Sequence, residues 1–483
     1  MKILFAASEV APFVKTGGLA DVAGSLPAAL AAHGHDVRVI LPLYSNINES
    51  WRDQMTFVKH FHFPLSWRNS YCGLFQLKLG NVLYYFVDNE YYFKRHSLYG
   101  HFDDGERFAY FSRAVIEVPD QVSWSPNIIH CNDWQTGLVP VYLLEAKHRF
   151  PCLSKTKSVF TIHNIEYQGR YDKTILGDVF GLDSSYFRED MLAYYGDVNL
   201  TKGAIYASDY VTTVSPTYAK ELQYSFYAHG LEGVIAANYY KMSGILNGLD
   251  IQQYNPNLDP DLTATYSSDD LAGKAICKNA LQKECGLELL PDVPIIACIS
   301  RLVSHKGYDL ITAAFPKIME HNVQFVILGT GDWGIEAFFR SAAKRYPERV
   351  SANLLYSTKL SAKIYAGADI LLMPSISEPC GLTQMIAMRY GTVPVVRLTG
   401  GLKDSVPSYN PATGKGLGFT FGNITAGDML SAVDRALELY DTEPLKWRQL
   451  MRNEMEVDLS WDKSALAYEE IYCKLSHNDL DPD

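Results

Sequence analysis

Basic residues are too few in this sequence for a nucleic-acid-binding surface to dominate it. The 483 residues include 43 Lys and Arg against 54 Asp and Glu, which gives a formal net charge of −11 at pH 7. Because binding to a nucleic-acid backbone requires a basic face, this balance argues against nucleic acid as the main partner. A local phosphate pocket stays compatible with it, since such a pocket needs only a few well-placed cations.

Paired cysteines and long apolar runs are also missing. The eight cysteines are scattered and none forms a C-x-x-C pair, so the pattern indicates neither a metal site nor a redox motif. No apolar run reaches the length of a membrane span, and the apolar run at the start ends at Glu9, too early for a signal peptide. We therefore expect a cytoplasmic protein with reduced thiols and no membrane partner.

What the sequence does contain is the pattern of a large α/β protein. Its 47% hydrophobic and 20% charged residues are typical of a globular chain, and its length predicts two or three domains. Short apolar runs alternate with helical patterns, as in βαβ units built on parallel sheets. In the first half we predict a helix over residues 20–32 and strands over 3–7, 37–41, 82–87, 128–130, 158–162 and 210–214. In the second half we predict strands over 294–299, 324–328, 370–373 and 393–396.

The two halves predict two doubly wound domains. We expect an N-terminal domain over residues 1–243 and a C-terminal domain over 244–461, with a hinge within 243–250. The acidic tail over 477–483 is expected to fray. Because ligands of doubly wound domains bind beyond the carboxyl ends of strands, functional motifs should follow strands in both halves.

Three motifs follow strands of the first half. In the loop from Lys15 to Asp21, two glycines and a helix start suit the approach of an anion, although a plain turn with a solvated lysine fits equally well. This loop is neither G-x-G-x-x-G nor a P-loop. The segments 130–134 and 163–164 place His and Asp after strands, where they could bind sugar hydroxyls or satisfy loop backbone groups.

Two motifs follow strands of the second half. Arg301 and Lys306 lie on one predicted loop and suit a diphosphate, with a solvated surface pair as the alternative. The segment 378–384 opens a helix, so its first N–H groups suit an anion, while the carboxylate of Glu378 suits sugar hydroxyls. Cys380 is interpreted as a packed thiol, because no activating His–Asn set accompanies it.

Taken together, six segments resemble the bacterial glycogen synthases and the related plant starch synthases. The resemblance extends over nearly the whole chain, from residue 1 to about 475. The segments are KTGGLADV at 15–22, HCNDWQTGL at 130–138, TIHNIEYQG at 161–169, NGLD at 247–250, SRLVSHKG at 300–307 and EPCGLTQMIAMRYG at 378–391.

The resemblance implies a GT-B fold, in which two Rossmann-like domains face each other across a deep cleft. In this family the last helix, here about 462–475, returns to the N-terminal domain. The implied reaction is the retaining transfer of glucose from ADP-glucose to the non-reducing end of an α-1,4-glucan such as glycogen. ADP is released, and neither a metal ion nor another cofactor is required.

The resemblance also assigns roles to individual residues. Arg301 and Lys306 would neutralise the leaving diphosphate, as preorganised charges do in many active sites. His163 and Glu378 complete the expected catalytic set, with His163 near the anomeric carbon and Glu378 on the glucosyl hydroxyls. Further donor contacts are expected from Lys15, Gly18, Asp21, Asn247, Tyr356, Cys380, Gly381, Leu382 and Thr383. Acceptor or sugar contacts are expected from Asp133 and Tyr99.

The chain departs from the GT-B pattern at one position that bears on the donor. Many GT-B enzymes carry a second glutamate eight residues after the first, but here that position is Ile386. The ribose is therefore expected to contact Thr383 or the backbone instead.

Two alternatives stay open at this stage. The first is a related GT-B transferase that uses UDP-glucose or another acceptor, because donor choice depends on a few base contacts. The second is a catalytically inactive glucan-binding protein that presents tyrosine faces; the chain has 32 tyrosines. A phosphorylase and a metal-dependent GT-A transferase are disfavoured, because neither a pyridoxal phosphate lysine context nor a convincing D-x-D motif is present.

Overall fold

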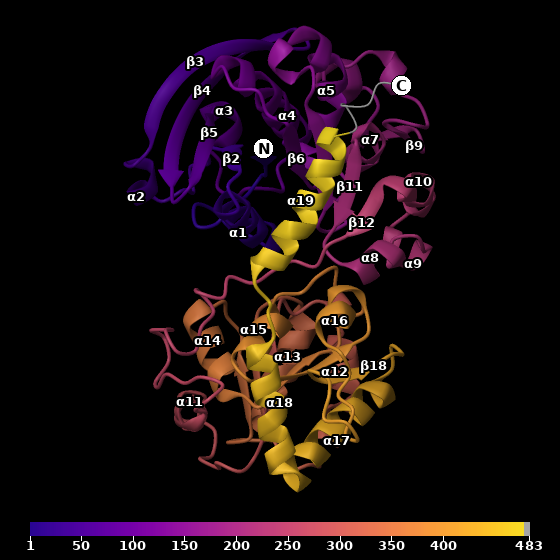
Figure 1. The fold of residues 1–483 in the computed structure, drawn as a ribbon. Helices are drawn as coiled ribbons and strands as arrows, with labels where there is room; N and C mark the ends of the chain where they lie inside the picture. The colour runs from indigo at the N-terminus through magenta and orange to yellow at the C-terminus, as the bar shows by residue number, and fades with distance from the viewer. Residues whose placement is uncertain (478–483) are drawn as a thin grey trace. The chain divides into compact units, whose positions relative to one another are not determined.

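The computed structural model describes residues 1–477, which form two compact units (Figure 1). Unit 1 combines Met1–Gly248 with the chain from Trp461 onward, and unit 2 is Leu249–Ser460. The unit boundary follows residue 248, beyond the expected 243, because strand β12 (Met242–Gly244) pairs in parallel with a strand of unit 1. The tail expected to fray lies outside the described residues, apart from residue 477. Within 1–477, no helix is long and apolar enough to span a membrane.

Unit 1 is built on a nine-stranded sheet with the order β12-β11-β7-β6-β1-β2-β5-β4-β3. Neighbouring strands from β12 to β5 pair in parallel, whereas β4 pairs antiparallel with both β3 and β5. The strands are β1 Lys2–Ala6, β2 Asp36–Pro42, β3 Thr56–Leu65, β4 Arg68–Leu79, β5 Val82–Asp88, β6 Ile128–Asn132, β7 Lys157–Ile162, β11 Tyr210–Thr213 and β12. The first strand lies between β2 and β6, so the sheet has a topological switch point at its carboxyl end.

Helices and a second, small sheet complete unit 1. The helices are α1 Gly18–Ala32, α2 Glu49–Arg52, α3 Glu90–Phe93, α4 Asp104–Gln121, α5 Leu138–Arg149, α6 Ile175–Asp178, α7 Leu200–Ala207, α8 Pro216–Glu221, α9 Ser225–Ala228, α10 Glu232–Asn238 and α19 Trp461–His477. The small antiparallel sheet contains β8 Arg170–Asp172, β9 Ala193–Tyr194 and β10 Asp197–Asn199. Helix α1 forms where apolar residues recur at helical spacing, and it buries Leu19, Val22 and Leu26.

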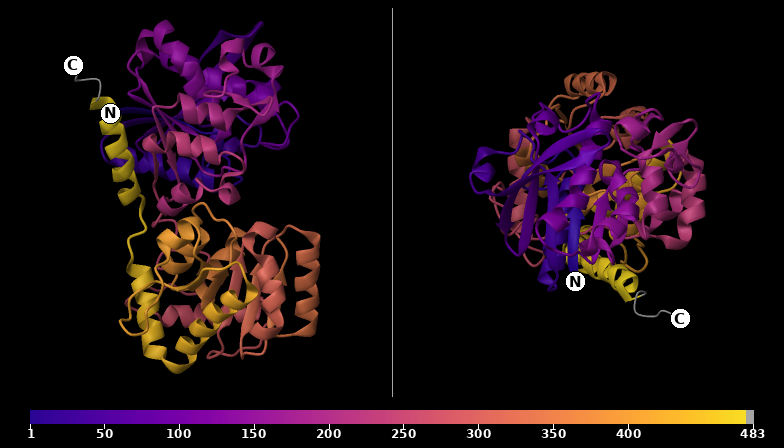
Figure 2. Two further views of the ribbon diagram at one scale, coloured as in Figure 1. Left: turned by 90° about the vertical axis from the view of Figure 1, so that its right-hand side faces the viewer. Right: turned by 90° about the horizontal axis from the view of Figure 1, so that it is seen from above.

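The last helix, α19, packs on unit 1 (Figures 1 and 2). The hydroxyl of Tyr472 lies 2.6 Å from Nδ1 of His130 on β6, and both residues are buried. Oε1 of Glu469 lies 2.7 Å from Nδ1 of His33, which ends α1. The expected return of this helix to the N-terminal domain is therefore a feature of the structure of unit 1.

Unit 2 is built on six parallel strands in the order β15-β14-β13-β16-β17-β18. The strands are β13 Ile295–Ile299, β14 Gln324–Leu328, β15 Val350–Asn353, β16 Ile370–Met373, β17 Val393–Arg397 and β18 Phe419–Phe421. The helices are α11 Ala272–Glu284, α12 Tyr308–Ile318, α13 Trp333–Arg345, α14 Thr358–Gly367, α15 Thr383–Arg389, α16 Gly400–Ser405, α17 Ala426–Thr442 and α18 Pro444–Glu456.

The sheet of unit 2 is buried on both faces. Along β13, Ile296 and Cys298 belong to the core that includes residues of α12 and α17, whereas Ile295 and Ala297 belong to a second core with residues of α11 and α14. These pairs of helices lie on opposite sides of the sheet in Figure 1. This alternation is what a parallel sheet covered on both faces requires. The predicted α/β class with two parallel-sheet domains is confirmed.

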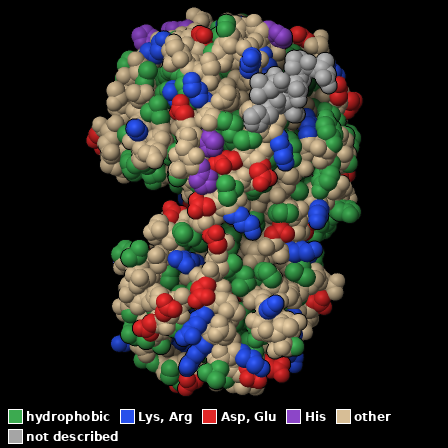
Figure 3. Space-filling model, in the orientation of Figure 1, with side chains coloured by type: hydrophobic (Ala, Val, Ile, Leu, Met, Phe, Trp, Pro, Cys, Tyr) green, Lys and Arg blue, Asp and Glu red, His purple; other side chains and the backbone are tan. Residues whose placement is uncertain are grey.

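The surface fits the charge balance of the sequence. Figure 3 shows Lys and Arg side chains interspersed with Asp and Glu over the face in view. On this face the described residues form no continuous basic stripe of the kind that a nucleic-acid backbone requires.

Candidate functional site

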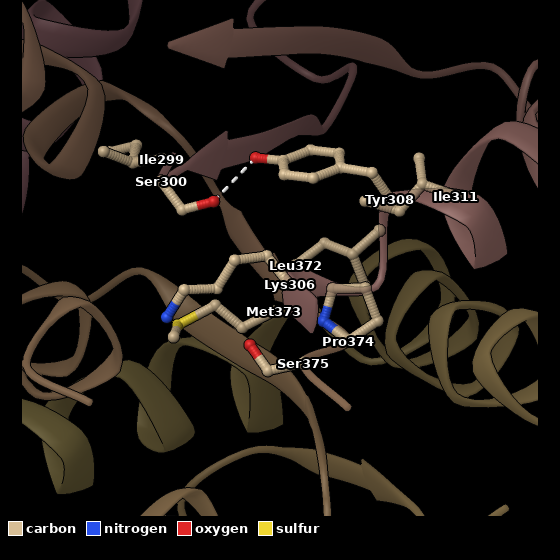
Figure 4. A pocket seen from close by; sticks show the side chains of 9 residues that line it. All are labelled: Ile299, Ser300, Lys306, Tyr308, Ile311, Leu372, Met373, Pro374 and Ser375. Atoms are coloured by element: carbon tan, nitrogen blue, oxygen red, sulfur yellow. Dashed lines mark hydrogen bonds between the residues drawn. The ribbon is translucent and has the colours of Figure 1, made fainter. Parts of the chain in front are cut away.

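Unit 2 has its switch point between β13 and β16, and the predicted cationic loop lies there. Strand β13 is followed by β14 on one side and flanked by β16 on the other, so their carboxyl ends leave a crevice. A small pocket at this point is lined by the ends of both strands, by Lys306 and by the start of α12 (Figure 4). The hydroxyls of Ser300 and Tyr308 lie 2.8 Å apart across it.

Gly307 brings the turn that carries Lys306 against the end of β16. Its φ of 78° lies in the left-handed region that favours glycine, and a Cβ there would overlap the carbonyl oxygen of Pro374. Beside it, the N–H of Ile376 donates to the carbonyl of His305 at 2.8 Å. These backbone contacts therefore hold Lys306 beside the end of β16.

Lys306 and Glu378 form an ion pair at this strand end. Nζ of Lys306 lies 2.6 Å from Oε2 of Glu378, and the hydroxyl of Ser375 donates to the same oxygen at 3.0 Å. Glu378 is buried, with 7% of its surface exposed. Its second carboxylate oxygen accepts no hydrogen bond from the described residues, so the carboxylate is held at one oxygen and available at the other.

Arg301 lies on the same loop and is exposed. Among residues 1–477 its guanidinium makes no hydrogen bond or ion pair, in contrast to Lys306. The structure thus brings Lys306 and Glu378 together, as expected. Arg301 lies five residues before Lys306, and its guanidinium has no partner among the described residues. Such a cation suits an anionic ligand.

The remaining predicted donor residues of unit 2 follow β16 and β15. Gly381 has a φ of 73°. Leu382 precedes α15 (Thr383–Arg389) and its side chain does not cap the helix, so no capping side chain accepts the first N–H groups of α15. Cys380 is buried, as a packed thiol would be. Tyr356 follows β15 with 81% of its surface exposed, and its ring contacts no other aromatic ring within 1–477.

Arg397 is a structural residue of this site that the sequence analysis missed. It is buried at the end of β17, and its guanidinium donates to the carbonyls of Ser375 (2.9 Å) and Ile376. These bonds hold the segment that leads to Glu378. The signal was weak, because the arginine ends an apolar strand and its partners are backbone carbonyls.

In unit 1, the first predicted motif lies at the switch point beside β1. Helix α1 begins at Gly18, and the preceding Gly17 has no side chain to cap it. Nζ of Lys15 lies 2.6 Å from Oδ1 of Asp21, and both side chains are partly exposed. The uncapped helix start and this lysine are the groups that an anion would meet.

Glu9 holds this loop, a role that the sequence analysis did not assign to it. Its Oε2 accepts hydrogen bonds from the N–H of Thr16 (2.5 Å), the hydroxyl of Thr16 (2.7 Å) and the N–H of Gly17 (3.3 Å). Burial raises the pKa of Glu9, although these bonds oppose the shift. The signal was an acidic residue directly after an apolar strand.

Asp133 and His163 form the centre of the unit 1 site. Oδ1 of Asp133 accepts the N–H of His163 at 2.7 Å and that of Asn164 at 3.4 Å. Burial lowers the pKa of His163 to about 3, so its ring is neutral at pH 7. Nε2 of that ring lies 2.9 Å from Oδ1 of Asn132, whose Nδ2 donates to the carbonyl of Ala6. This arrangement favours the tautomer that donates through Nε2 and leaves Nδ1 as an acceptor.

Tyr99 lies within electrostatic range of Asp133, and Asn247 follows a strand farther along the same sheet. The hydroxyl of Tyr99 lies 2.8 Å from that of Ser8, and burial, reinforced by the negative charge of Glu9, raises the pKa of Tyr99 well above its usual value. Asn247 follows β12, two strands from β7. It is buried, and its Oδ1 has no hydrogen-bond partner among the described residues. This oxygen can accept a hydrogen bond from a ligand or from water.

Asp133→Asn is expected to remove part of the pH dependence of stability. Burial raises the pKa of Asp133 from 3.8 to about 7, so the folded chain keeps a proton that the unfolded chain releases. The stabilisation by this group is full below pH 4 and is lost as the pH rises to about 7. Between pH 5 and pH 8 it should decrease by about 2–3 kcal/mol.

The measurement is urea unfolding of wild type and Asp133→Asn at both pH values. Asparagine keeps the acceptor for the two N–H groups, and the buried histidines titrate equally in both proteins. From pH 5 to pH 8, the unfolding free energy of wild type should decrease relative to that of the variant. A difference that is the same at both pH values would show that Asp133 in the folded protein does not change its protonation state between pH 5 and pH 8.

Comparison with protein families gives matches in both units. The starch synthase catalytic domain family matches residues 2–237, and the glycosyl transferases group 1 family matches residues 287–449. A glycogen synthase of Geobacillus thermodenitrificans is 50% identical over 475 residues, which cover 98% of each chain. A glycogen synthase of Desulforamulus reducens is 48% identical over 478 residues, which cover 99% of each chain.

Solved structures agree with these matches. The catalytic domain of starch synthase IV from Arabidopsis thaliana, bound to ADP and acarbose, superposes with a TM-score of 0.91 at 37% identity. The match covers 98% of this chain and 99% of that one. A sucrose-phosphate synthase from Thermosynechococcus elongatus has a TM-score of 0.62 at 18% identity over 98% of both chains, which supports the fold alone.

Proposed function

The chain belongs to the glycogen synthase family of GT-B glucosyltransferases, and on that premise we propose how its residues carry out the transfer. The predicted family, fold and type of enzyme are confirmed. In the proposed reaction, glucose passes from ADP-glucose to the non-reducing end of an α-1,4-glucan, with retained anomeric configuration and release of ADP. The ADP and acarbose bound to the relative from Arabidopsis thaliana support both substrates.

The observation that carries the proposal is the Lys306–Glu378 pair at the switch point of unit 2. Bond cleavage places negative charge on the diphosphate, which Lys306 and Arg301 stabilise because their charges are already in position. Glu378 accepts hydrogen bonds from sugar hydroxyls through Oε1, while Ser375 and Lys306 donate to its Oε2. Gly381, Leu382 and Thr383 add backbone N–H groups.

Residues of unit 1 have complementary proposed roles. Lys15 and the start of α1 bind phosphate, and Asp21 holds the lysine in the absence of that ligand. His163 acts as a neutral hydrogen-bonding group on the transferred glucose, because its ring carries no charge at pH 7. Asp133 and Tyr99 hold sugar hydroxyls around it.

A few further roles complete the proposal. Asn247 contacts the transferred glucose with its unpaired Oδ1, Tyr356 stacks on the adenine, and Thr383 contacts the ribose. Retention follows a front-face route, in which the acceptor hydroxyl attacks as the bond to phosphate breaks. The leaving phosphate then takes the proton of that hydroxyl. We also propose a cytoplasmic location, as the sequence predicts.

The test is the release of nucleoside diphosphate from ADP-glucose or UDP-glucose, with and without glycogen. We expect release from ADP-glucose that depends on glycogen and lengthens its chains. Release from UDP-glucose alone would replace the donor but keep the reaction type. Binding of glycogen without release from either donor would indicate an inactive glucan-binding protein instead.

A further inference from the structure

Unit 1 has a second, more open pocket that none of these roles uses. It is lined by residues that follow β6 and β7 and by His229 after α9. We call it the Trp134 pocket, after the residue that follows Asp133. It encloses about 410 Å³, within the range of about 300–1,000 Å³ that is typical of small-molecule sites.

The indole of Trp134 is held in a fixed position on one wall. The ring of Phe108 meets it edge-on at 5.2 Å, and the ring of Tyr171 lies 6.2 Å away. At Gly169, φ is 63° and a Cβ would lie 2.6 Å from Cε3 of Trp134, so any other residue there would displace the indole. The indole N–H makes no hydrogen bond within residues 1–477, which leaves a donor beside a fixed aromatic face.

Hydrogen bonds also fix a second part of the lining, which includes one exposed ring. His229 adopts the left-handed conformation, and its carbonyl accepts Nε2 of Gln168 at 3.1 Å. The same Nε2 donates to the carbonyl of Ile165, which ties the two loops together. Tyr167 presents its ring to solvent with 52% of its surface exposed, and no described residue bonds to its hydroxyl.

The charges of the pocket select against an anionic ligand. The guanidinium of Arg170 lies 3.0 Å from Oδ2 of Asp197 and covers the ring of Tyr194 at 4.8 Å, so its charge is already compensated. The other charged side chain of the lining is the acidic Glu166. Fixed aromatic faces with neutral donors and acceptors fit a ligand that has apolar ring faces and hydroxyl edges, which describes a sugar chain.

The rim of the pocket is hydrogen-bonded to the Asp133 site. The N–H of Glu166 donates to Oδ1 of Asn164 at 3.0 Å, and the N–H of Asn164 donates to Asp133. We infer that the Trp134 pocket binds glucose units of the acceptor glucan that follow its reacting end. This inference rests on the proposed function, because the acceptor is the sugar chain that such a pocket would meet.

Tyr167→Ala tests the inference, with Tyr167→Phe and Tyr240→Ala as controls. Tyr240 is a more exposed tyrosine of unit 1 (83% against 52% for Tyr167) and does not line the pocket, so its loss controls for the removal of a surface tyrosine ring. KM would be measured for maltose, longer maltooligosaccharides up to maltoheptaose, and glycogen, at saturating ADP-glucose. We expect Tyr167→Ala to raise KM about tenfold for the long acceptors, which corresponds to 1.4 kcal/mol, and much less for maltose. The turnover number and the affinity for ADP should stay within about twofold of wild type in all three variants.

The dependence on acceptor length separates binding in the pocket from a general structural defect. A Tyr167→Ala variant with the KM of wild type at every length, or with an equal loss at every length, would overturn the inference. If wild type transferred no glucose from any donor, the proposed function would fail, and maltoheptaose binding would still test the pocket. Titration followed by tryptophan fluorescence would then have to show weaker binding to Tyr167→Ala than to Tyr240→Ala, and equal binding would overturn the inference.

Discussion

Lys306→Ala is expected to lower the turnover of ADP-glucose about 10²–10³-fold, as the loss of one preorganised charge does in other active sites. The variant removes the cation that stabilises the leaving diphosphate and also leaves the buried carboxylate of Glu378 with Ser375 as its remaining described partner. ADP should bind more weakly, because the same cation attracts the product. The measurements are glycogen-dependent ADP release and ADP affinity by calorimetry.

Lys317→Ala is the matched control for this variant. Lys317 lies on α12 and pairs with Glu320 at 3.0 Å, but both side chains are 64% exposed. An exposed pair contributes about 0–1 kcal/mol to stability, so activity and stability should remain near wild type. If Lys306→Ala retained full turnover, the assignment of this lysine to the leaving group would be wrong.

Glu378→Gln should reduce kcat/KM for ADP-glucose about 10²-fold or more and leave ADP binding nearly unchanged. Glutamine keeps the size of the side chain, but it lacks the negative charge that pairs with Lys306 and accepts hydrogen bonds from the sugar hydroxyls. ADP has no sugar hydroxyls at this position, so its affinity should respond to Lys306→Ala and not to Glu378→Gln.

Glu320→Gln serves as its control, because it makes the same change in the exposed Lys317–Glu320 pair. Weak ADP binding by Glu378→Gln would contradict the proposed division, since the carboxylate would then contact the nucleotide portion. Equal kcat/KM in Glu378→Gln and wild type would exclude a role for this carboxylate in holding the donor glucose.

The parallel core of both units was predictable because buried strands form continuous apolar runs. The strand expected over 294–299 is β13, and the one expected over 370–373 is β16. The antiparallel edge of unit 1 was not predicted, because β3 and β4 mix aromatic, polar and basic residues without one clear period. The small sheet was missed as well, since its strands have only two or three residues each.

The candidate site was predictable in its residue types but not in its pairings. Lys306 and Glu378 are 72 residues apart in the chain, and only the order of β13 and β16 in the sheet brings them together. Glu9 and Arg397 form hydrogen bonds with backbone groups. The positions of these groups depend on the fold, so no sequence motif indicates them. The direct contacts of Arg301 and Tyr356 with a donor stay predictions.

The position of α19 has a consequence for the order in which the chain is completed during synthesis. The residues of this helix that pack against unit 1 include the buried Ala465, Tyr468 and Tyr472, which follow all of unit 2 in the sequence. All of unit 2 is translated between the rest of unit 1 and this helix. Synthesis of unit 1 therefore begins before that of unit 2 but is completed after it. On the ribosome, α19 cannot cover the surface around His130 until unit 2 has been synthesised.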